Sequence, residues 1–338
     1  MAKRPADERF TERVAREMDA MYAAAQRDIA AAAARAFAQL ADAPTRSAEF
    51  RSARAAALGR EIDARVRALG VSTRRTLRGA SDDAVAQALA QAEAELRAIG
   101  LDPANAPPSL AARFDRPGDD EAVRTLAEDA VHRALADAGA DLERATRDYG
   151  RTTVAAFRSL SESVSRLAGP GEREVNRALA RGIATGNPTI ADRAVRELFR
   201  DPNSPERQTA RQLGAQVVQV GGATLTVRQY AAIVTRTRTR EAVVEARHRG
   251  LRGAGVRLVQ ITGRVSVNFC TAYLGLVCGL DGPVTIDGET YPALASLPNG
   301  GPPFHPQCSK GTAAYVVELV SEARREAHER ARERVMRG

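Results

Sequence analysis

Apolar positions from residue 8 to residue 40 recur at steps of three and four, which places them on one face of a helix. The series includes Val14, Met18 and Phe37, and Arg and Asp occupy the opposite side. A residue before proline disfavours the α conformation, so this helix should end near Ala43, which precedes a proline. The pattern predicts one long amphipathic helix at the start of the chain.

The same periodicity continues through the rest of the first half. It predicts further helices over about 47–69, 81–100, 119–148 and 152–167. Between the first two, Gly70 is the predicted stop and Ser81 the predicted N-cap. A Pro- and Asp-rich stretch from 101 to 120 is expected to be an irregular connector.

The second half mixes short helices with strands. Helices are expected over about 172–186, 190–199, 230–249 and 318–338, a hairpin over 217–226 and a strand over 256–261. The expected fold class is α+β and mostly α-helical. An Ala-rich helical region (1–170) is followed by a small mixed domain with a Cys/His loop (171–317) and a final helix (318–338).

Composition narrows the class of protein. Aromatic residues make up 4% of the 338 residues and Trp is absent, which argues against a β-sandwich built on aromatic packing. Lys and Arg number 50 against 42 acidic residues, and only Lys3 and Lys310 are lysines. A GC-rich genome or contact with a polyanion would each explain so much arginine. We find no signal peptide, membrane span or nucleotide-binding loop, and expect a chain kept inside a cell or packaged from one.

The helix expected at 230–249 begins a strongly basic stretch. From residue 228 to 257 the chain has eight arginines against Glu241 and Glu245. The candidates for binding nucleic acid or an acidic partner are Arg236, Arg238, Arg240, Arg247, Arg249 and Arg252. The alternative is a solvated helix face with some buried ion pairs. The stretch has few aromatic residues, so stacking on single strands is not indicated.

All three cysteines lie in the last quarter of the chain, close to one histidine. Thiolate and imidazole ligands in two pairs separated by a loop are typical of structural zinc, so Cys270, Cys278, His305 and Cys308 are candidate ligands. Seven residues separate the first pair, which is wide for a zinc knuckle. A smaller cluster with Cys278 simply buried, a disulfide, or unrelated core cysteines therefore remain open. A Cys–His nucleophile is a further alternative, for which the sequence offers no orienting third group.

Three stretches of the second half form a recognisable combination: the helix start Ile-Val-Thr-Arg-Thr-Arg-Thr-Arg-Glu at 233–241, Asn-Phe-Cys at 268–270, and Gly-Gly-Pro-Pro-Phe-His-Pro-Gln-Cys at 300–308. Together they resemble the C-terminal domain of minor head proteins of tailed phages, the MuF-like head morphogenesis family, and the related phage minor capsid protein 2. The resemblance covers about 171–317. It departs at Gln307, where Asn is usual, and at Ser309-Lys310, where Arg-Cys or Arg-His is frequent.

The resemblance implies a structural virion protein inside the head, near the portal and packaged double-stranded DNA, that contributes to head assembly and, in some members of the family, to DNA delivery. It implies Cys270, His305 and Cys308 as a structural cluster and Pro302, Pro303 and Pro306 as residues that shape the loop. Its partners would be the portal and other head proteins, with host cytoplasm as the place of assembly. We expect no enzymatic activity, membrane or small-molecule substrate. The alternative function is a free nucleic-acid-binding protein with a zinc-stabilised C-terminal domain.

Overall fold

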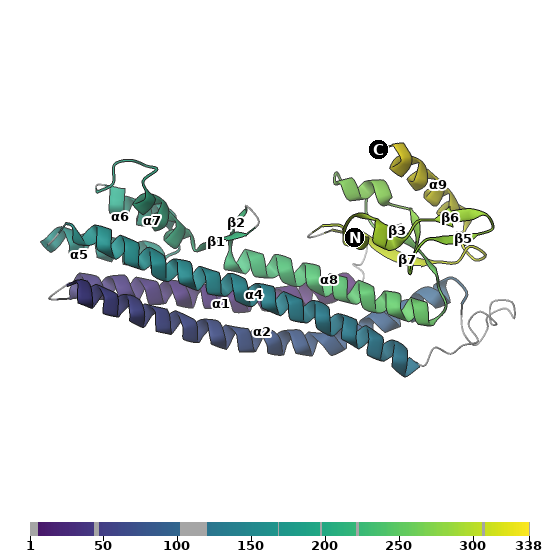
Figure 1. Cartoon of the computed structure of the whole chain (residues 1–338), viewed down its shortest axis with the longest axis horizontal. Helices are drawn as coiled ribbons and strands as arrows, with labels where there is room; N and C mark the ends of the chain where they lie inside the picture. Colours follow the sequence, from purple (N-terminus) through teal and green to yellow (C-terminus); the bar gives the residue numbers. More distant parts are fainter. Residues whose placement is uncertain are drawn as a thin grey trace. The chain divides into compact units, whose positions relative to one another are not determined.

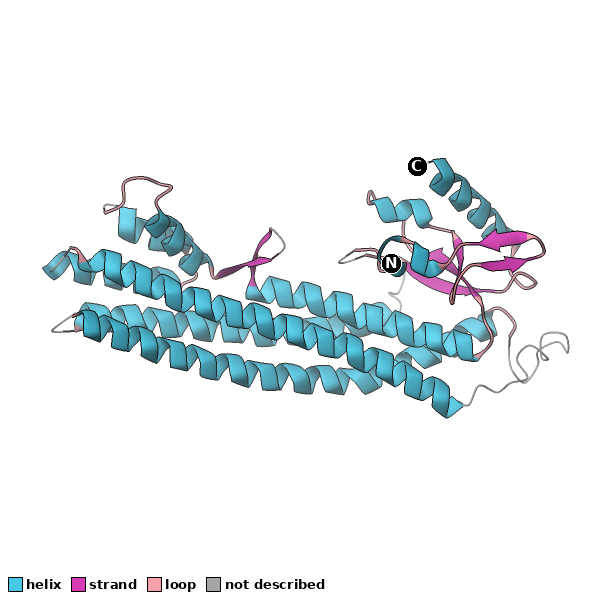
Figure 2. Cartoon of the chain, in the orientation of Figure 1, coloured by secondary structure: helices cyan, strands magenta, loops and turns pink. Residues whose placement is uncertain are grey.

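The computed structural model describes residues 6–43, 47–101, 120–167, 169–196, 198–220, 223–305 and 308–337. Over these residues the chain is mostly α-helical, with three small antiparallel sheets that lie in its second half (Figure 1, Figure 2). The predicted α+β class is confirmed. No helix among the described ranges combines the length and the apolar character that crossing a membrane requires. The connector expected at 101–120 lies, apart from its two end residues, outside the described residues.

The described part of the first half consists of three long helices: α1 (Ala6–Asp42), α2 (Ala48–Ala98) and α4 (Asp120–Ser165). The end of α1 agrees with the prediction from the proline after Ala43. The breaks expected at Gly70, at Ser81 and after residue 148 are wrong, because α2 and α4 continue through them.

Close helix packing explains why these residues do not end a helix. Gly70 is buried against Glu143 of α4, and a Cβ atom on Gly150 would lie 2.6 Å from Ile62 of α2. Ser81 is 1% exposed and faces the interior instead of capping a helix start. A glycine inside a helix costs about 1 kcal/mol relative to alanine, and the contact it permits with a neighbouring helix offsets that cost.

The chain continues through α5 (Gly169–Ala184), α6 (Pro188–Arg196), α7 (Pro205–Ala215), β1 (Val217–Val220) and β2 (Ala223–Thr226). A Cβ atom on Gly182 would lie 2.6 Å from the backbone nitrogen of Ala191, so this glycine allows α5 and α6 to approach closely. Arg207 of α7 forms a buried ion pair with Asp192 of α6 at 2.7 Å. The β1–β2 hairpin was predicted, and α7 was not.

The last third consists of α8 (Val227–Gly253) and a small α+β assembly. The strands are β3 (Leu258–Thr262), β4 (Val277–Gly279), β5 (Val284–Ile286), β6 (Glu289–Tyr291) and β7 (Gly311–Tyr315), with short 3-10 turns η1 (Phe269–Tyr273), η2 (Leu294–Ser296) and η3 (Pro298–Gly300) between them, and α9 (Glu322–Arg337) follows. One antiparallel sheet has the order β4-β3-β7, and β5 pairs with β6. Gly275, at φ +96°, lets the carbonyl of Ala327 in α9 pack directly on the turn that leads into β4.

The chain divides into two compact units. One comprises residues 1–14, 76–138 and 233–338, and the other comprises 15–75 and 139–232. Because α1, α2, α4 and α8 contribute residues to both, the units do not coincide with the ranges 1–170, 171–317 and 318–338 expected from the sequence.

Candidate metal centre

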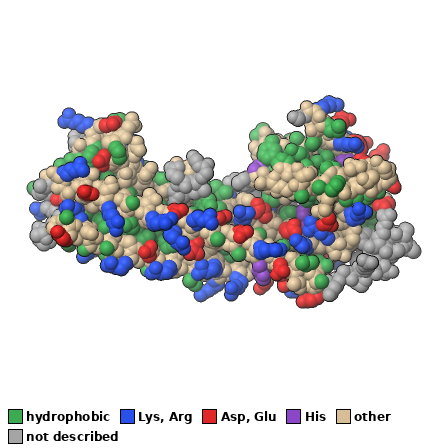
Figure 3. Space-filling model, in the orientation of Figure 1, with side chains coloured by type: hydrophobic (Ala, Val, Ile, Leu, Met, Phe, Trp, Pro, Cys, Tyr) green, Lys and Arg blue, Asp and Glu red, His purple; other side chains and the backbone are tan. Residues whose placement is uncertain are grey.

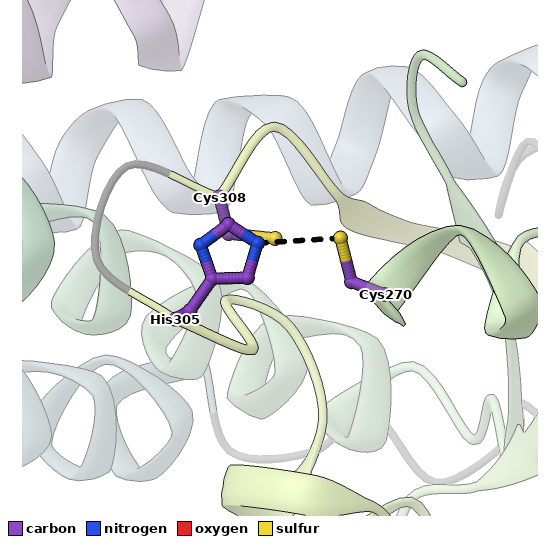
Figure 4. Close-up of side chains that lie close together, drawn as sticks. All are labelled: Cys270, His305 and Cys308. Atoms are coloured by element: carbon purple, nitrogen blue, oxygen red, sulfur yellow. Dashed lines mark hydrogen bonds between the residues drawn. The ribbon is translucent and has the colours of Figure 1, made fainter. Parts of the chain in front are cut away.

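Two distant stretches bring three of the four predicted ligands together (Figure 4). Cys270 lies on η1, and His305 and Cys308 lie on the loop that leads into β7. The Sγ atom of Cys270 is 3.3 Å from Nε2 of His305, and the ligand atoms of all three side chains lie within 4.8 Å of one another. Pro302 and Pro303 in the same loop are buried, whereas the predicted loop residue Pro306 lies outside the described residues.

Aromatic packing holds this loop against η1. The ring of Phe304 stacks on Tyr273 with centroids 5.1 Å apart, and Phe269 packs edge-on against Phe304 and tilted against His305. Cys270 and Cys308 are each 1% exposed. The two thiols therefore belong to the hydrophobic core of this part of the chain.

The surroundings favour the charged form of Cys270. Burial raises the pKa of its thiol, but hydrogen bonds with His305, Ser266 and Cys308 and the positive charge of Lys310 outweigh burial and hold that pKa below its ordinary value. Lys310 is fully buried, and its ammonium group donates to the carbonyl oxygen of Arg264 and to Oγ of Ser266 at 3.3 Å. A buried cation beside the cluster stabilises a thiolate there.

The basic helix reaches the same site. Arg240 of α8 donates from its guanidinium group to the carbonyl oxygens of Cys308 and Lys310, the latter at 3.1 Å. The backbone nitrogen of Lys310 lies 3.5 Å from Sγ of Cys308. Arg240 thus anchors the backbone around Cys308 to α8.

These residues fit a zinc ion. Zinc binds cysteine sulfur at about 2.3 Å and histidine nitrogen at about 2.0 Å, so ligands of one ion lie roughly 3–4.5 Å apart. The three ligand atoms here lie within 4.8 Å of one another, close to this spacing. Zinc is usually four-coordinate, so three protein ligands leave one position for water or another donor. A metal held here would cross-link η1 to the loop before β7.

The four-ligand prediction is not met, because Cys278 does not join the cluster. It lies on β4 opposite Val259 of β3 and is fully buried in the hydrophobic core. Burial raises the pKa of its thiol to about 12, which opposes the thiolate form that a metal requires. All three cysteines are free thiols, so the structure contains no disulfide among them.

Glu289, His328 and Glu329 form a second group close enough to hold a metal. Nδ1 of His328 accepts a hydrogen bond from the backbone nitrogen of Val277 at 3.0 Å, so the neutral ring carries its hydrogen on Nε2. Nε2 lies 3.2 Å from Oε1 of Glu289 and donates to it. Since neither ring nitrogen keeps a free lone pair, this group is a clamp between α9 and the sheet.

Every arginine proposed for nucleic-acid binding on α8 has a partner within its own unit. Arg236 pairs with Glu12, Arg238 with Glu241, Arg247 with Glu95, Arg249 with Glu245, and Arg252 with Asp281 and Glu245, while Arg240 holds the loop carbonyls. This arrangement favours the alternative of a helix face with ion pairs. All six candidate arginines are therefore engaged, whereas Arg257 of the same stretch is exposed and has no ion pair among the described residues.

Sequence reasoning missed a buried polar cluster beside these arginines. Arg247 is 5% exposed on its side chain and donates to Oγ1 of Thr312, whose hydroxyl lies 2.7 Å from Nε2 of His248. The hydroxyl of Thr312 thus bridges the guanidinium group of Arg247 and the ring of His248. Burial, followed by the charges of Arg247 and Arg252, holds the pKa of His248 well below its ordinary value.

We expect this histidine to make the fold sensitive to mild acid. Unfolding exposes His248 and returns its pKa to about 6.5, so the unfolded state binds a proton that the folded state does not, and stability falls as the pH drops below that value. Between pH 7.5 and pH 5.5 the free energy of unfolding should fall by about 1.4 kcal/mol from this group alone. Urea titrations of the wild type and His248→Gln at both pH values measure the difference, and an equal fall in both would contradict the assignment.

Comparisons with known proteins give no relative. No protein-family model, curated protein or solved structure matches the chain.

Proposed function

We propose that this chain is a non-enzymatic structural protein of a tailed-phage head, located inside the capsid near the portal and the packaged DNA. One observation supports it most strongly. The three stretches that resemble the minor head protein family, at 233–241, 268–270 and 300–308, are far apart in the chain and meet at one point. There Cys270, His305 and Cys308 cluster and Arg240 holds the backbone of the last stretch.

The same cluster supports a structural role over a catalytic one. A thiol paired with an imidazole is also the arrangement of a nucleophilic cysteine. A substrate must reach such a thiol, and Cys270 and Cys308 are both buried in the core. A ligand set for a structural metal fits this burial better, because the metal needs no access once the domain has folded.

An exposed apolar loop beside the cluster supports a protein partner. Val265, Val267 and Phe269 are 77%, 105% and 55% exposed, at alternate positions from the loop after β3 to the first residue of η1. Exposed apolar side chains grouped in this way mark protein interaction sites. We propose that this loop contacts the portal or another head protein.

Particle assembly tests the proposal. The chain is expressed with the head genes of its phage, and purified heads are analysed by mass spectrometry before and after protease treatment. We expect the wild type in intact heads and protected from protease. The variant Val265→Ser/Val267→Ser should be depleted, whereas Leu126→Ser, which removes an exposed apolar side chain of α4, should incorporate normally. Absence of the wild-type chain from heads would overturn the proposal.

A further inference from the structure

The compact unit made of residues 15–75 and 139–232 has an arginine-rich surface. This surface is separate from the Cys/His site, which belongs to the other unit. Two sets of arginines recur at seven-residue steps, and each set occupies one face of its helix because seven residues are nearly two helical turns. We call these residues the double arginine row: Arg60, Arg67 and Arg74 on α2, and Arg144, Arg151 and Arg158 on α4.

The two rows lie side by side on the same outer face. Glu143 of α4 pairs with Arg74 of α2, and Gly150 of α4 contacts Ile62 of α2, so the helices run antiparallel in contact. Glu143 also pairs with Arg147 one turn along α4, at 2.6 Å. Since one carboxylate meets arginines from both helices, the rows flank a single seam; α2 and α4 contain no lysine, so the blue side chains along these helices in Figure 3 are arginines.

Much of this charge is uncompensated. All six arginines of the double arginine row are exposed, and Arg75 and Arg147 add to them. The described residues give no ion pair to Arg60, Arg67, Arg75 or Arg158. Residues 60–75 and 141–158 together contain nine arginines and five carboxylates, Glu61, Asp63, Asp141, Glu143 and Asp148, and Glu61 pairs with Arg35 and Arg65. This contrasts with α8, whose arginines are all engaged.

The chemistry of the surface selects its partner. Guanidinium groups suit phosphate, and rows with about 10 Å between successive arginines suit a long regular polyanion. None of the exposed residues of α2 and α4 in this unit is aromatic, which argues against stacking on single strands and against insertion into a membrane surface. We propose that the double arginine row binds the phosphate backbone of duplex DNA without reading its sequence.

The test uses the full chain and a matched control. Affinity for a 30-base-pair duplex of arbitrary sequence is measured by fluorescence anisotropy from 50 to 200 mM salt. The row variant is Arg60→Gln/Arg67→Gln/Arg151→Gln/Arg158→Gln. The control is Arg173→Gln/Arg181→Gln/Arg193→Gln/Arg200→Gln, which removes four exposed arginines of the same unit outside the row. Circular dichroism melts verify that both variants fold.

Each lost phosphate contact lowers the slope of log affinity against log salt by about 0.9, so the row variant, which removes four arginines, should lose about 3.6 in slope and at least about 30-fold in affinity at 100 mM salt. The control should stay within about threefold of the wild type. Equal losses in both variants, no binding by the wild type at 50 mM salt, or binding only to anionic vesicles would each overturn the proposal. The outcome is separate from the proposed function, because incorporation into heads is measured independently of affinity for free DNA.

Discussion

Replacing Cys308 by serine should abolish stoichiometric zinc binding and the stability that zinc confers. The sulfur of Cys308 is one of three ligand atoms that lie within 4.8 Å of one another, and a hydroxyl group is a much poorer zinc ligand than a thiolate. In the wild type, zinc at a hundredfold excess over its Kd should raise the free energy of unfolding by about 2.7 kcal/mol, because the site forms only in the folded chain. The variant should gain nothing from added zinc.

Elemental analysis of the purified chain gives the stoichiometry, and urea titration with and without a chelator gives the stability. Cys278→Ala is the matched control, since Cys278 is an equally buried thiol outside the cluster. It should keep one zinc per chain and lose only packing energy, on the order of 1 kcal/mol. Cobalt added in place of zinc should bind to Cys278→Ala and not to Cys308→Ser, and its visible absorption measures this difference. A metal-free wild type whose melting is unchanged by Cys308→Ser would refute the metal centre.

Periodicity in the sequence was a good guide to the helices and a poor guide to where they end. The helix boundaries expected at Gly70, at Ser81 and after residue 148 all lie inside continuous helices. The reason is tertiary: a small residue at a helix contact lets two helices approach, and this gain cannot be seen in one segment alone. The proline after Ala43, in contrast, restricts its own backbone and gave the correct end of α1.

The candidate site also has residues that the sequence could identify and residues that only the structure could. Cys270, His305 and Cys308 could be named from the sequence because few other residue types bind metals. Excluding Cys278 required knowing that β4 directs it into the core beside β3. The clamp at His328 had no motif to reveal it, because its partners come from β4 and β6.

The net charge of a sequence segment was the least reliable predictor of a binding surface. The eight arginines from 228 to 257 suggested a phosphate-binding stretch, yet Arg236, Arg247 and Arg252 pair with acidic residues from outside it, namely Glu12, Glu95 and Asp281. Residues 51–80 contain as many arginines, eight against Glu61 and Asp63, and three of these belong to the double arginine row. A search for periodic charge on helix faces would have found the row, because its seven-residue spacing is visible in the sequence.

The ion pair between Arg247 and Glu95 should be among the most costly to break in the molecule. Nη1 of Arg247 lies 2.9 Å from Oε1 of Glu95, and the other carboxylate oxygen accepts from the backbone nitrogen of Ala314 at 3.1 Å, so the pair joins α8, α2 and β7. Glu95→Gln leaves a buried guanidinium without its counter-charge. Removing one partner of a buried pair costs about 3–5 kcal/mol, far more than an exposed pair contributes.

Urea unfolding of the full chain measures this cost, with Asp83→Asn as the matched control because Asp83 pairs with Arg13 at 2.7 Å on the surface. The control should change stability by less than about 1 kcal/mol. The double variant Glu95→Leu/Arg247→Met should be more stable than Glu95→Gln alone, since it removes the uncompensated charge together with its carboxylate. If Glu95→Gln cost no more than Asp83→Asn, solvent would have to reach Arg247, and the arginines of α8 would again be available to a phosphate partner.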